Sequence, residues 1–401
     1  MDYLSKRVKN MEESATLAMT SKSRELASQG LDVINLSIGE PDFNTPEFIK
    51  EAGKKAIDEN YTHYPPVPGY QDLREAICIK LRRDNQLEYK PNQIVVSTGA
   101  KQALANCILS TVDPGDEVII PVPYWVSYTE LVKLAEGKPI FVKATVDNDF
   151  KITAKQLEEA ITPRTRLLIF NSPNNPSGSV YNWQELKSLA EVLARHPQVL
   201  ILSDEIYEYI VFSGKHCSLA SFPEIKNRVA LINGVSKGYA MTGWRLGYIA
   251  APQNIASACN KIQGQITSAT SSISQRAAIA AMLRHPDETP ELQQMVSAFI
   301  QRRDIVLNLL AEIPEIKTNV PEGAFYVFAD FSAFLAKSDG KKQIHSIDDL
   351  CMYLLEKALV ALVPGTAFGD PQCLRISYAT SENNLVKALQ RIKEALARSE
   401  E

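Results

Sequence analysis

Residues 165–207 contain the strand–helix–strand pattern that decides the fold: TRLLIFNSP (165–173), NWQELKSLAEVLARH (182–196) and QVLILSDEIY (198–207). The first and third segments each contain an unbroken apolar run, as strands do when both of their faces are buried. The middle segment repeats its leucines and alanines at helical spacing. Two such strands separated by a helix predict a βαβ unit in a parallel sheet.

The same alternation extends along most of the chain. Further strands are expected at 92–99, 116–123, 138–144, 228–236 and 247–252, with helical patterns between most of them. This predicts an α/β fold with a mainly parallel central sheet in a large domain spanning residues 45–285. A long helix, short strands at 316–320 and 323–331 and two further helices predict a smaller α+β domain at 286–401, to which residues 1–44 contribute.

The composition is that of an ordinary globular protein, with 45% hydrophobic and 22% charged residues among 401. A net charge of -4 without a basic stripe argues against a nucleic-acid partner. The six cysteines and five histidines are scattered, so no metal site is expected, and a reducing cytoplasm is the expected location. The N-terminal residues lack a signal-peptide core, and no apolar run is long enough to cross a membrane.

Ligands of open parallel sheets bind beyond the carboxyl ends of the strands, so the residues at these ends are the candidate site. Gly99, Ala100 and Lys101 form a turn that opens a helix, where free N–H groups suit a phosphate. There is no GxGxxG or Walker motif here, so an ordinary strand-to-helix turn is the alternative. Trp125 follows the next strand and is suited to stacking on a planar ring, with core packing as its alternative.

Two more strand ends carry polar groups. Asn175 lies in a loop that two prolines and a glycine make rigid, and its amide can donate a hydrogen bond. Asp204 ends a buried strand, where a carboxylate is costly unless a cation or donor pairs with it. Tyr207 is placed to reach the same ligand. A structural turn and a helix N-cap at Asp204 are the alternative interpretations.

The stretch VSKGYAMTGWR (235–245) sets Lys237 and Arg245 among small or apolar residues without any acid. Desolvation and a second cation would lower the pKa of Lys237 and make its amine a nucleophile or base, whereas an isolated lysine is usually a solvated surface residue. We expect Gly238 and Gly243 to bend the backbone so that both cations face one anionic ligand. Together the strand-end groups suit a planar, phosphorylated, pyridine-like aldehyde.

Residues 234–247, GVSKGYAMTGWRLG, resemble the lysine-attachment signature of the class I aminotransferases. The resemblance continues through SIGEPDFNTP (37–46), NSPNNPSG (171–178), LRISYA (374–379) and other segments across nearly the whole chain. It is closest to the bacterial-type aspartate aminotransferases, subgroup Ib, which are pyridoxal-phosphate enzymes of fold type I.

This resemblance implies roles for the candidate residues. Lys237 would hold pyridoxal 5'-phosphate covalently, and its freed amine would then move a proton between the substrate Cα and C4′ of the cofactor. Asp204 would pair with the protonated pyridine nitrogen and keep the ring an electron sink. Tyr207 and Asn175 would hydrogen-bond the 3-oxygen of the ring, and Trp125 would stack on its face.

The resemblance also implies how the phosphate and the substrate are bound. The phosphate would be held at the turn after the strand at 92–99 and by the stretch that carries the lysine, through Gly99, Ala100, Lys101, Ser236 and Arg245. Tyr64 would reach the phosphate of a neighbouring subunit, which implies a homodimer with shared active sites. Arg375 would grip the substrate α-carboxylate with a bidentate fork, helped by Asn175 and the N–H of Gly39.

The implied reaction is a ping-pong transfer of an amino group from an L-amino acid, aspartate first, to 2-oxoglutarate. The animal enzymes carry an arginine for the distal carboxylate in the stretch matching residues 261–267, which here holds only Gln263 and Gln265 as long polar groups besides Lys261. Ser14, Thr16 and Lys101 are candidates for that end of the pocket. Prephenate, aromatic or neutral substrates remain alternatives, because one pocket residue shifts preference by about 1–3 kcal/mol.

Other protein classes fit less well. A lyase of the same fold is compatible with retention of the α-carboxylate by Arg375. A transcription regulator with an aminotransferase-like domain would need a DNA-binding unit ahead of it, and about 30 residues are too few for one. A dehydrogenase would need a GxGxxG motif after its first strand, which is missing.

Overall fold

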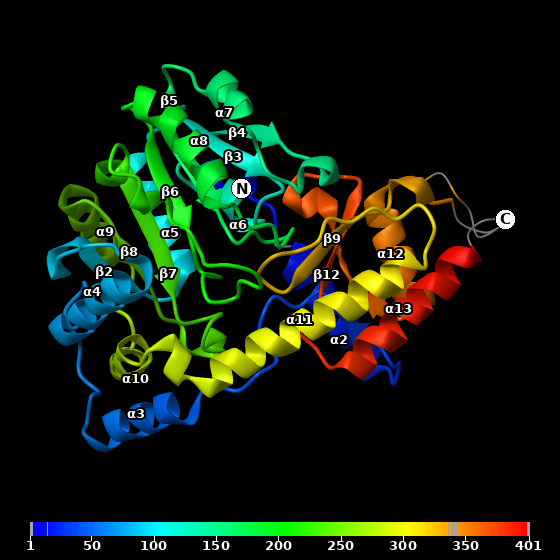
Figure 1. The fold of residues 1–401 in the computed structure, drawn as a ribbon, viewed down its shortest axis with the longest axis horizontal. Coiled ribbons are helices and arrows are strands. Elements are labelled where there is room, and N and C mark those ends of the chain that lie inside the picture. Colours follow the sequence, from blue (N-terminus) through cyan, green and yellow to red (C-terminus); the bar gives the residue numbers. More distant parts are fainter. Residues whose placement is uncertain (1–2, 14, 336, 338–342, 399–401) are drawn as a thin grey trace.

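A seven-stranded sheet forms the centre of the computed structural model, which describes residues 3–13, 15–335, 337 and 343–398. The strand order is β2-β8-β7-β6-β5-β3-β4 (Figure 1). The strands are β2 Ile94–Ser97, β3 Glu117–Val122, β4 Lys138–Lys143, β5 Thr165–Asn171, β6 Leu200–Asp204, β7 Val229–Gly234 and β8 Gly247–Ala250. Only β8 runs antiparallel to its neighbours β2 and β7, so the predicted mainly parallel sheet is confirmed.

Helices cover both faces of this sheet. Successive side chains of a strand point to opposite faces, and in the central strands both sets are apolar. In β5, Leu167 and Ile169 pack toward one helical layer, and Leu168 and Phe170 pack toward the other. The first layer contains α5 Ala100–Thr111, α6 Ser127–Leu134 and α9 Gln253–Ile266. The second contains α3 Glu47–Asp58, α4 Gln71–Asn85, α7 Ala154–Ala160, α8 Trp183–Arg195 and α10 Ser272–Leu283. The sequence patterns did not predict α9 or α10.

A second core lies around a small antiparallel sheet in the order β11-β12-β9. Its strands and helices are β9 Tyr326–Asp330, β11 Val363–Pro364, β12 Cys373–Ser377, α11 Pro290–Ala311, α12 Ile347–Lys357 and α13 Glu382–Ala397. The expected strand at 316–320 was wrong: only one bridge forms, between Lys317 and Asp330. The side chain of Asn319 there bonds to Ser179, and Pro321, which follows, has no N–H for a ladder.

Of the N-terminal residues, 15–36 pack on this second core, whereas residues 6–12 lie against α6 and the turn after it, where Arg7 pairs with Glu136 and the N–H of Glu12 donates to Glu130. The short strand β1 Ile34–Asn35 pairs in parallel with β10 Val360–Ala361, and it follows α1 Lys6–Lys9 and α2 Ala15–Ser28. Figure 1 shows that α11 starts near α10 and extends toward the right of the view, where it lies alongside α13. None of the helices in the described ranges combines the length and apolar character needed to span a membrane.

Candidate active site

A cavity of about 450 Å³ lies where the carboxyl ends of the large sheet meet the second core. All predicted site residues except Gly99 and Tyr64 line it. The lining brings together side chains from β6 and β12 and from the segments that follow β2, β3, β5, β6 and β7. These residues are Gly39, Ala100, Lys101, Trp125, Asn175, Asp204, Tyr207, Ser236, Lys237, Arg245 and Arg375. The residues predicted from the rule that ligands bind beyond the carboxyl ends of parallel strands therefore lie around one cavity.

Gly99 and Tyr64 lie elsewhere, each for a different reason. Gly99 stands directly behind the cavity wall, where a Cβ would come within 2.3 Å of a terminal nitrogen of Arg245. Its φ of +82° also favours glycine. Tyr64 is 95% exposed on the outer surface and does not reach the cavity of its own chain.

Lys237 presents a buried amine to the cavity. Its Nζ donates to the carbonyl oxygen of Gly39 at 2.5 Å and lies 5.8 Å from the ring centroid of Tyr207. Burial is the main cause that lowers the pKa of Lys237 to about 8; Arg375 and Arg245 act in the same direction, and the carboxylates of Glu40 and Asp204 oppose it. An amine with this pKa is partly unprotonated near neutral pH, so it can act as nucleophile or base.

Asp204 is a buried carboxylate held by two donors. The hydroxyl of Tyr128 donates to its Oδ2 at 2.7 Å, and the N–H of Ile206 donates to its Oδ1 at 3.3 Å. Burial raises the pKa of Asp204 to about 6 despite both hydrogen bonds. The carboxylate that ends β6 is therefore energetically costly unless a cation binds beside it. Tyr128 was not among the predicted residues, although it follows Trp125 at helical spacing.

We predict that Asp204→Asn changes how the stability of the ligand-free protein depends on pH. The folded protein holds the Asp204 proton more tightly than the unfolded chain does, so wild-type stability falls as pH rises from 3.8 through about 6. The fall amounts to about 3 kcal/mol for a shift of this size. Urea unfolding at pH 4 and pH 7 should show that the variant lacks this loss, and equal pH slopes in the two proteins would contradict the assignment.

One end of the cavity is suited to an anion. Gly99 is the N-cap residue of helix α5 and has no side chain to cap it. The N–H groups of Ala100 and Lys101, which line the cavity, therefore have no partner within the helix. Arg245 and Ser236 line the same cavity. A positive helix end, a guanidinium and a hydroxyl together form a phosphate-sized donor set.

The backbone bends in the lysine stretch are not made by the glycines expected to make them. Neither Gly238 nor Gly243 has a positive φ. The left-handed residues are Ala240, with φ of 50°, and Arg245, with φ of 53°. Gly238 is instead needed for space, because a Cβ there would lie 2.6 Å from the ring of Tyr209.

Arg375 enters the cavity from β12 and is only 1% exposed. One terminal nitrogen donates to Oδ1 of Asn175 at 3.0 Å and the other to the carbonyl oxygen of Ser37 at 2.6 Å. Its Nε is buried without a partner in the described structure. Burial lowers the pKa of Arg375, yet a guanidinium stays charged in proteins. This buried cation is therefore suited to bind an anionic group of a ligand.

Aromatic side chains complete the walls. The hydroxyl of Tyr207 lies 3.0 Å from that of Tyr326, which also lines the cavity and lies beneath the Arg375 guanidinium at 4.6 Å. Trp125 packs edge-on against Tyr128, and the Nζ of Lys101 lies 4.9 Å from the Trp125 ring centroid. Sequence reasoning missed Tyr326, since a tyrosine in an apolar strand looks like core.

The remaining wall comes from α2, which supplies Thr16, Leu17, Thr20 and Arg24. Of the residues proposed for substrate discrimination, Thr16 and Lys101 line the cavity, whereas Ser14 lies outside the described residues. Gln263 points elsewhere: it is fully buried and bonds to Ser97, Asn106 and two backbone carbonyls.

Comparison with known proteins gives a consistent result. The family model described as aminotransferase class I and II matches residues 31–392. An aspartate/prephenate aminotransferase of Nitrosomonas europaea is 46% identical, covering 98% of this chain and 100% of that protein. An aspartate aminotransferase of Geobacillus stearothermophilus is 48% identical, covering 97% and 98%. The crystal structure of the Rhizobium meliloti aspartate aminotransferase superposes with a TM-score of 0.95 at 44% identity, covering 99% of this chain and 100% of that one.

Proposed function

Because the chain belongs to the class I and II aminotransferases, we propose that it transfers the amino group of L-aspartate to 2-oxoglutarate with pyridoxal 5'-phosphate as cofactor. The reaction would be ping-pong, with the donor and the acceptor using one site in turn. The observation that carries this proposal is the buried amine of Lys237 in a cavity that also holds Asp204 and Arg375. The bacterial relatives named as aspartate aminotransferases support the choice of donor.

The residues of the cavity fit this cofactor. The uncapped start of α5, Ser236 and Arg245 provide donors for its phosphate. Asp204, whose burial is costly as an isolated carboxylate, gains a cationic partner if it faces the protonated ring nitrogen. Trp125 offers a ring for stacking, and Lys237 offers an amine for covalent attachment.

Pyridoxal phosphate, when bound, supplies a ring that withdraws electrons from the substrate Cα and so makes its proton removable. Lys237 Nζ would take the proton from the substrate Cα and deliver it to C4′ of the cofactor, which the pKa of about 8 of this amine permits. Asp204, with a pKa of about 6, is ionised near neutral pH and would keep the ring nitrogen protonated. Tyr207 and Asn175 would donate hydrogen bonds to the ring 3-oxygen, and Arg375 with the N–H of Gly39 would orient the α-carboxylate.

A half-reaction screen tests the proposal. Enzyme in the pyridoxal form is mixed with each of the twenty amino acids and with arogenate, and the rate of conversion to the pyridoxamine form is followed by absorbance. Fast conversion with aspartate and glutamate, reversed by 2-oxoglutarate, is the expected result. Preference for neutral donors would exclude the aspartate assignment while leaving the reaction class intact, and loss of α-carboxylate or side chain from the donor would instead indicate lyase chemistry.

A second candidate substrate is prephenate, whose amino product is arogenate. Several relatives carry this activity in their names, among them the protein from Nitrosomonas europaea. Aspartate and prephenate both carry a second carboxylate. Lys101 and Thr16 line the cavity and are suited to receive it. Aromatic or neutral amino acids remain the less favoured alternatives.

We predict that Lys101→Met lowers kcat/KM for aspartate by about 10–100-fold and for alanine by much less, because only aspartate presents a distal carboxylate. The backbone N–H proposed for the phosphate is retained in this variant. Lys133→Met is the matched control, since Lys133 pairs with Glu130 on α6 and does not line the cavity. Equal losses for aspartate and alanine would place the distal carboxylate elsewhere.

We further propose a cytoplasmic homodimer with the domain division 1–44 and 286–401 against 45–285. The exposed Tyr64 supports dimerisation, because a tyrosine that is 95% exposed gains a partner if it reaches the phosphate in a second copy. All six cysteines are free, which supports a reducing compartment. Light scattering, with Tyr64→Phe tested for weaker cofactor binding, would examine the shared site.

A further inference from the structure

A buried ion pair lies behind the active site, outside the cavity. Lys80 of α4 and Glu208, in the turn after β6, are 1% and 7% exposed, and the Lys80 ammonium contacts Glu208 Oε1 directly. Asn85 accepts from Lys80 at 2.8 Å and donates to Glu208 Oε2 at 2.9 Å. Both charges are therefore paired and hydrogen-bonded without contacting any group assigned to the reaction.

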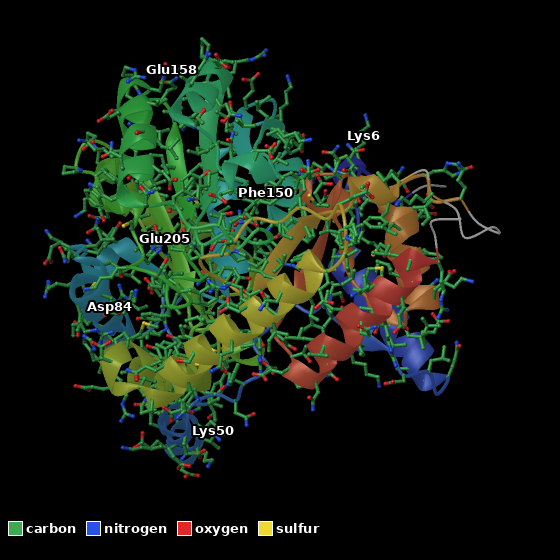
Figure 2. All side chains as sticks on the ribbon, turned by 45° about the vertical axis from the view of Figure 1, so that its right-hand side comes forward. Lys6, Lys50, Asp84, Phe150, Glu158 and Glu205 are labelled. Carbon is green, nitrogen blue, oxygen red and sulfur yellow. The ribbon has the colours of Figure 1, made fainter. Side chains whose placement is uncertain are left out.

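The same end of α4 grips a second side chain of that turn. The hydroxyl of Tyr209 donates to Asp84 Oδ2 at 2.6 Å, and Arg83 holds Asp84 through a bidentate pair while also donating to the carbonyl oxygen of Met282 in α10. Burial raises the pKa of Tyr209 well above its ordinary value, so this phenol remains a donor. Figure 2 places Asp84 on α4 and Glu205, at the start of the turn, on the same side of the molecule.

The turn itself, residues 205–210, belongs to no helix or strand. Its own backbone bonds are few: Glu208 N–H to the Glu205 carbonyl at 3.0 Å and Ile210 N–H to the Tyr207 carbonyl at 2.8 Å. Tyr207 faces the cavity, whereas its neighbours Glu208 and Tyr209 face α4. The Tyr207 ring itself packs on Phe325 and Tyr326, while the backbone that carries it is anchored by the next two side chains.

The grip also reaches the reactive lysine. The Tyr209 ring packs on Gly238, where even a Cβ would approach it to 2.6 Å, and Gly238 directly follows Lys237. The ring also lies edge-on to Tyr239, 5.6 Å between centroids, and the Tyr239 hydroxyl donates to the carbonyl oxygen of Ala281. One buried network thus touches the backbone on which Tyr207 and Lys237 stand.

We infer that the Lys80–Glu208 pair and the Tyr209–Asp84 hydrogen bond are positioning groups that hold Tyr207 and Lys237 in register toward the cofactor, an inference that rests on the proposed function. Buried ion pairs contribute little net stability compared with apolar residues of similar volume. They do restrict geometry, because each charge has one arrangement in which it is fully paired. A turn without regular backbone bonding needs such restriction more than a strand does.

Four variants test the inference: Lys80→Met, Glu208→Gln, the double variant Lys80→Met/Glu208→Gln, and the matched control Glu117→Gln. Glu117 is also a buried carboxylate, bonded to Arg164 at 2.7 Å, but it lies at the amino end of β3, away from the cavity. The first readout is the pH midpoint of the visible absorbance of the enzyme loaded with pyridoxal phosphate. The second is amide hydrogen exchange of residues 205–210 and 237–241 in the cofactor-free protein.

Each single variant at the pair should raise the absorbance midpoint by about 0.5 unit or more, because a displaced Tyr207 no longer favours the ionised form of the ring 3-oxygen. Exchange in both segments should quicken about tenfold. The double variant should recover thermal stability relative to Lys80→Met, since no buried charge is left unpaired, yet keep the raised midpoint.

Two outcomes would overturn the inference: a wild-type midpoint and wild-type exchange in Glu208→Gln and the double variant, or an equal midpoint shift in Glu117→Gln. Failure of the proposed function looks different, because the wild-type protein itself would then take up no cofactor. Hydrogen exchange is measured without cofactor. Even if the wild-type protein bound none, the exchange rates would show whether the network restrains residues 205–210 and 237–241.

Discussion

Replacing Lys237 with alanine is expected to lower kcat by about 10⁴-fold, the upper range for removal of a positioned proton-transfer group. The Lys237 amine lines the cavity and donates to the carbonyl oxygen of Gly39 at 2.5 Å. Its lowered pKa suits it to take up and release a proton near neutral pH. The measurement is the single-turnover rate of the pyridoxal-loaded protein with aspartate.

Lys237→Arg is the matched control for charge. It keeps a cation in the cavity, but a guanidinium does not give up its proton, so this variant should be as slow as Lys237→Ala. Thermal unfolding midpoints should show that both variants are folded. The alanine variant should be at least as stable as the wild type, because it no longer buries an ammonium group. A rate within about tenfold of wild type in either variant would exclude Lys237 as the proton-transfer group.

Arg375→Leu is expected to lower kcat/KM by about 10²–10³-fold for both the donor and the acceptor, because a buried charge-assisted pair is worth about 2–5 kcal/mol. Both substrates carry the same α-carboxylate, so both half-reactions should suffer. The guanidinium is already oriented by Asn175 and Ser37, which lowers the entropy lost on binding. Steady-state kinetics with each substrate varied in turn measures the loss.

Two controls separate binding from folding at this position. Arg375→Lys keeps the charge without the planar fork and should recover only part of kcat/KM. Arg228→Leu removes another partly buried guanidinium, which bonds to the carbonyl oxygens of Val199 and Leu193, away from the cavity. It should lower stability and leave KM unchanged. A loss confined to one of the two substrates would assign Arg375 to something other than the α-carboxylate.

The sequence could predict the large sheet because apolar runs and helical spacing are local signals. β5, α8 and β6 fall within the segments expected from residues 165–207. The reversed strand β8 carries no such signal, since an apolar strand reads the same in either direction. Helix α10 was missed because it is rich in serine and alanine and carries Arg276 as its one charged residue, so it lacks a clear polar face.

The candidate site could be predicted where its residues end or follow strands of the large sheet, as Asp204 and Lys237 do. Arg375 lies inside a strand of another sheet, so only family resemblance pointed to it. Tyr128 and Tyr326 act through hydroxyl groups whose direction depends on tertiary packing. The two residues proposed for substrate discrimination, Thr16 of α2 and Lys101 of α5, meet in the cavity only through tertiary packing, and local sequence patterns do not encode that contact.

The parallel pairing of β1 with β10 has a consequence for synthesis of the chain on the ribosome. Ile34 pairs with Val360, so β1 has no strand partner until residue 360 has been synthesised. The seven-stranded sheet needs nothing beyond Ala250 for its strands. At about 5–20 residues per second, an interval of roughly 5–20 s separates the two events. During this interval the nascent chain carries Lys237 without Arg375, so the cavity is incomplete although the sheet that bears its lysine can already form.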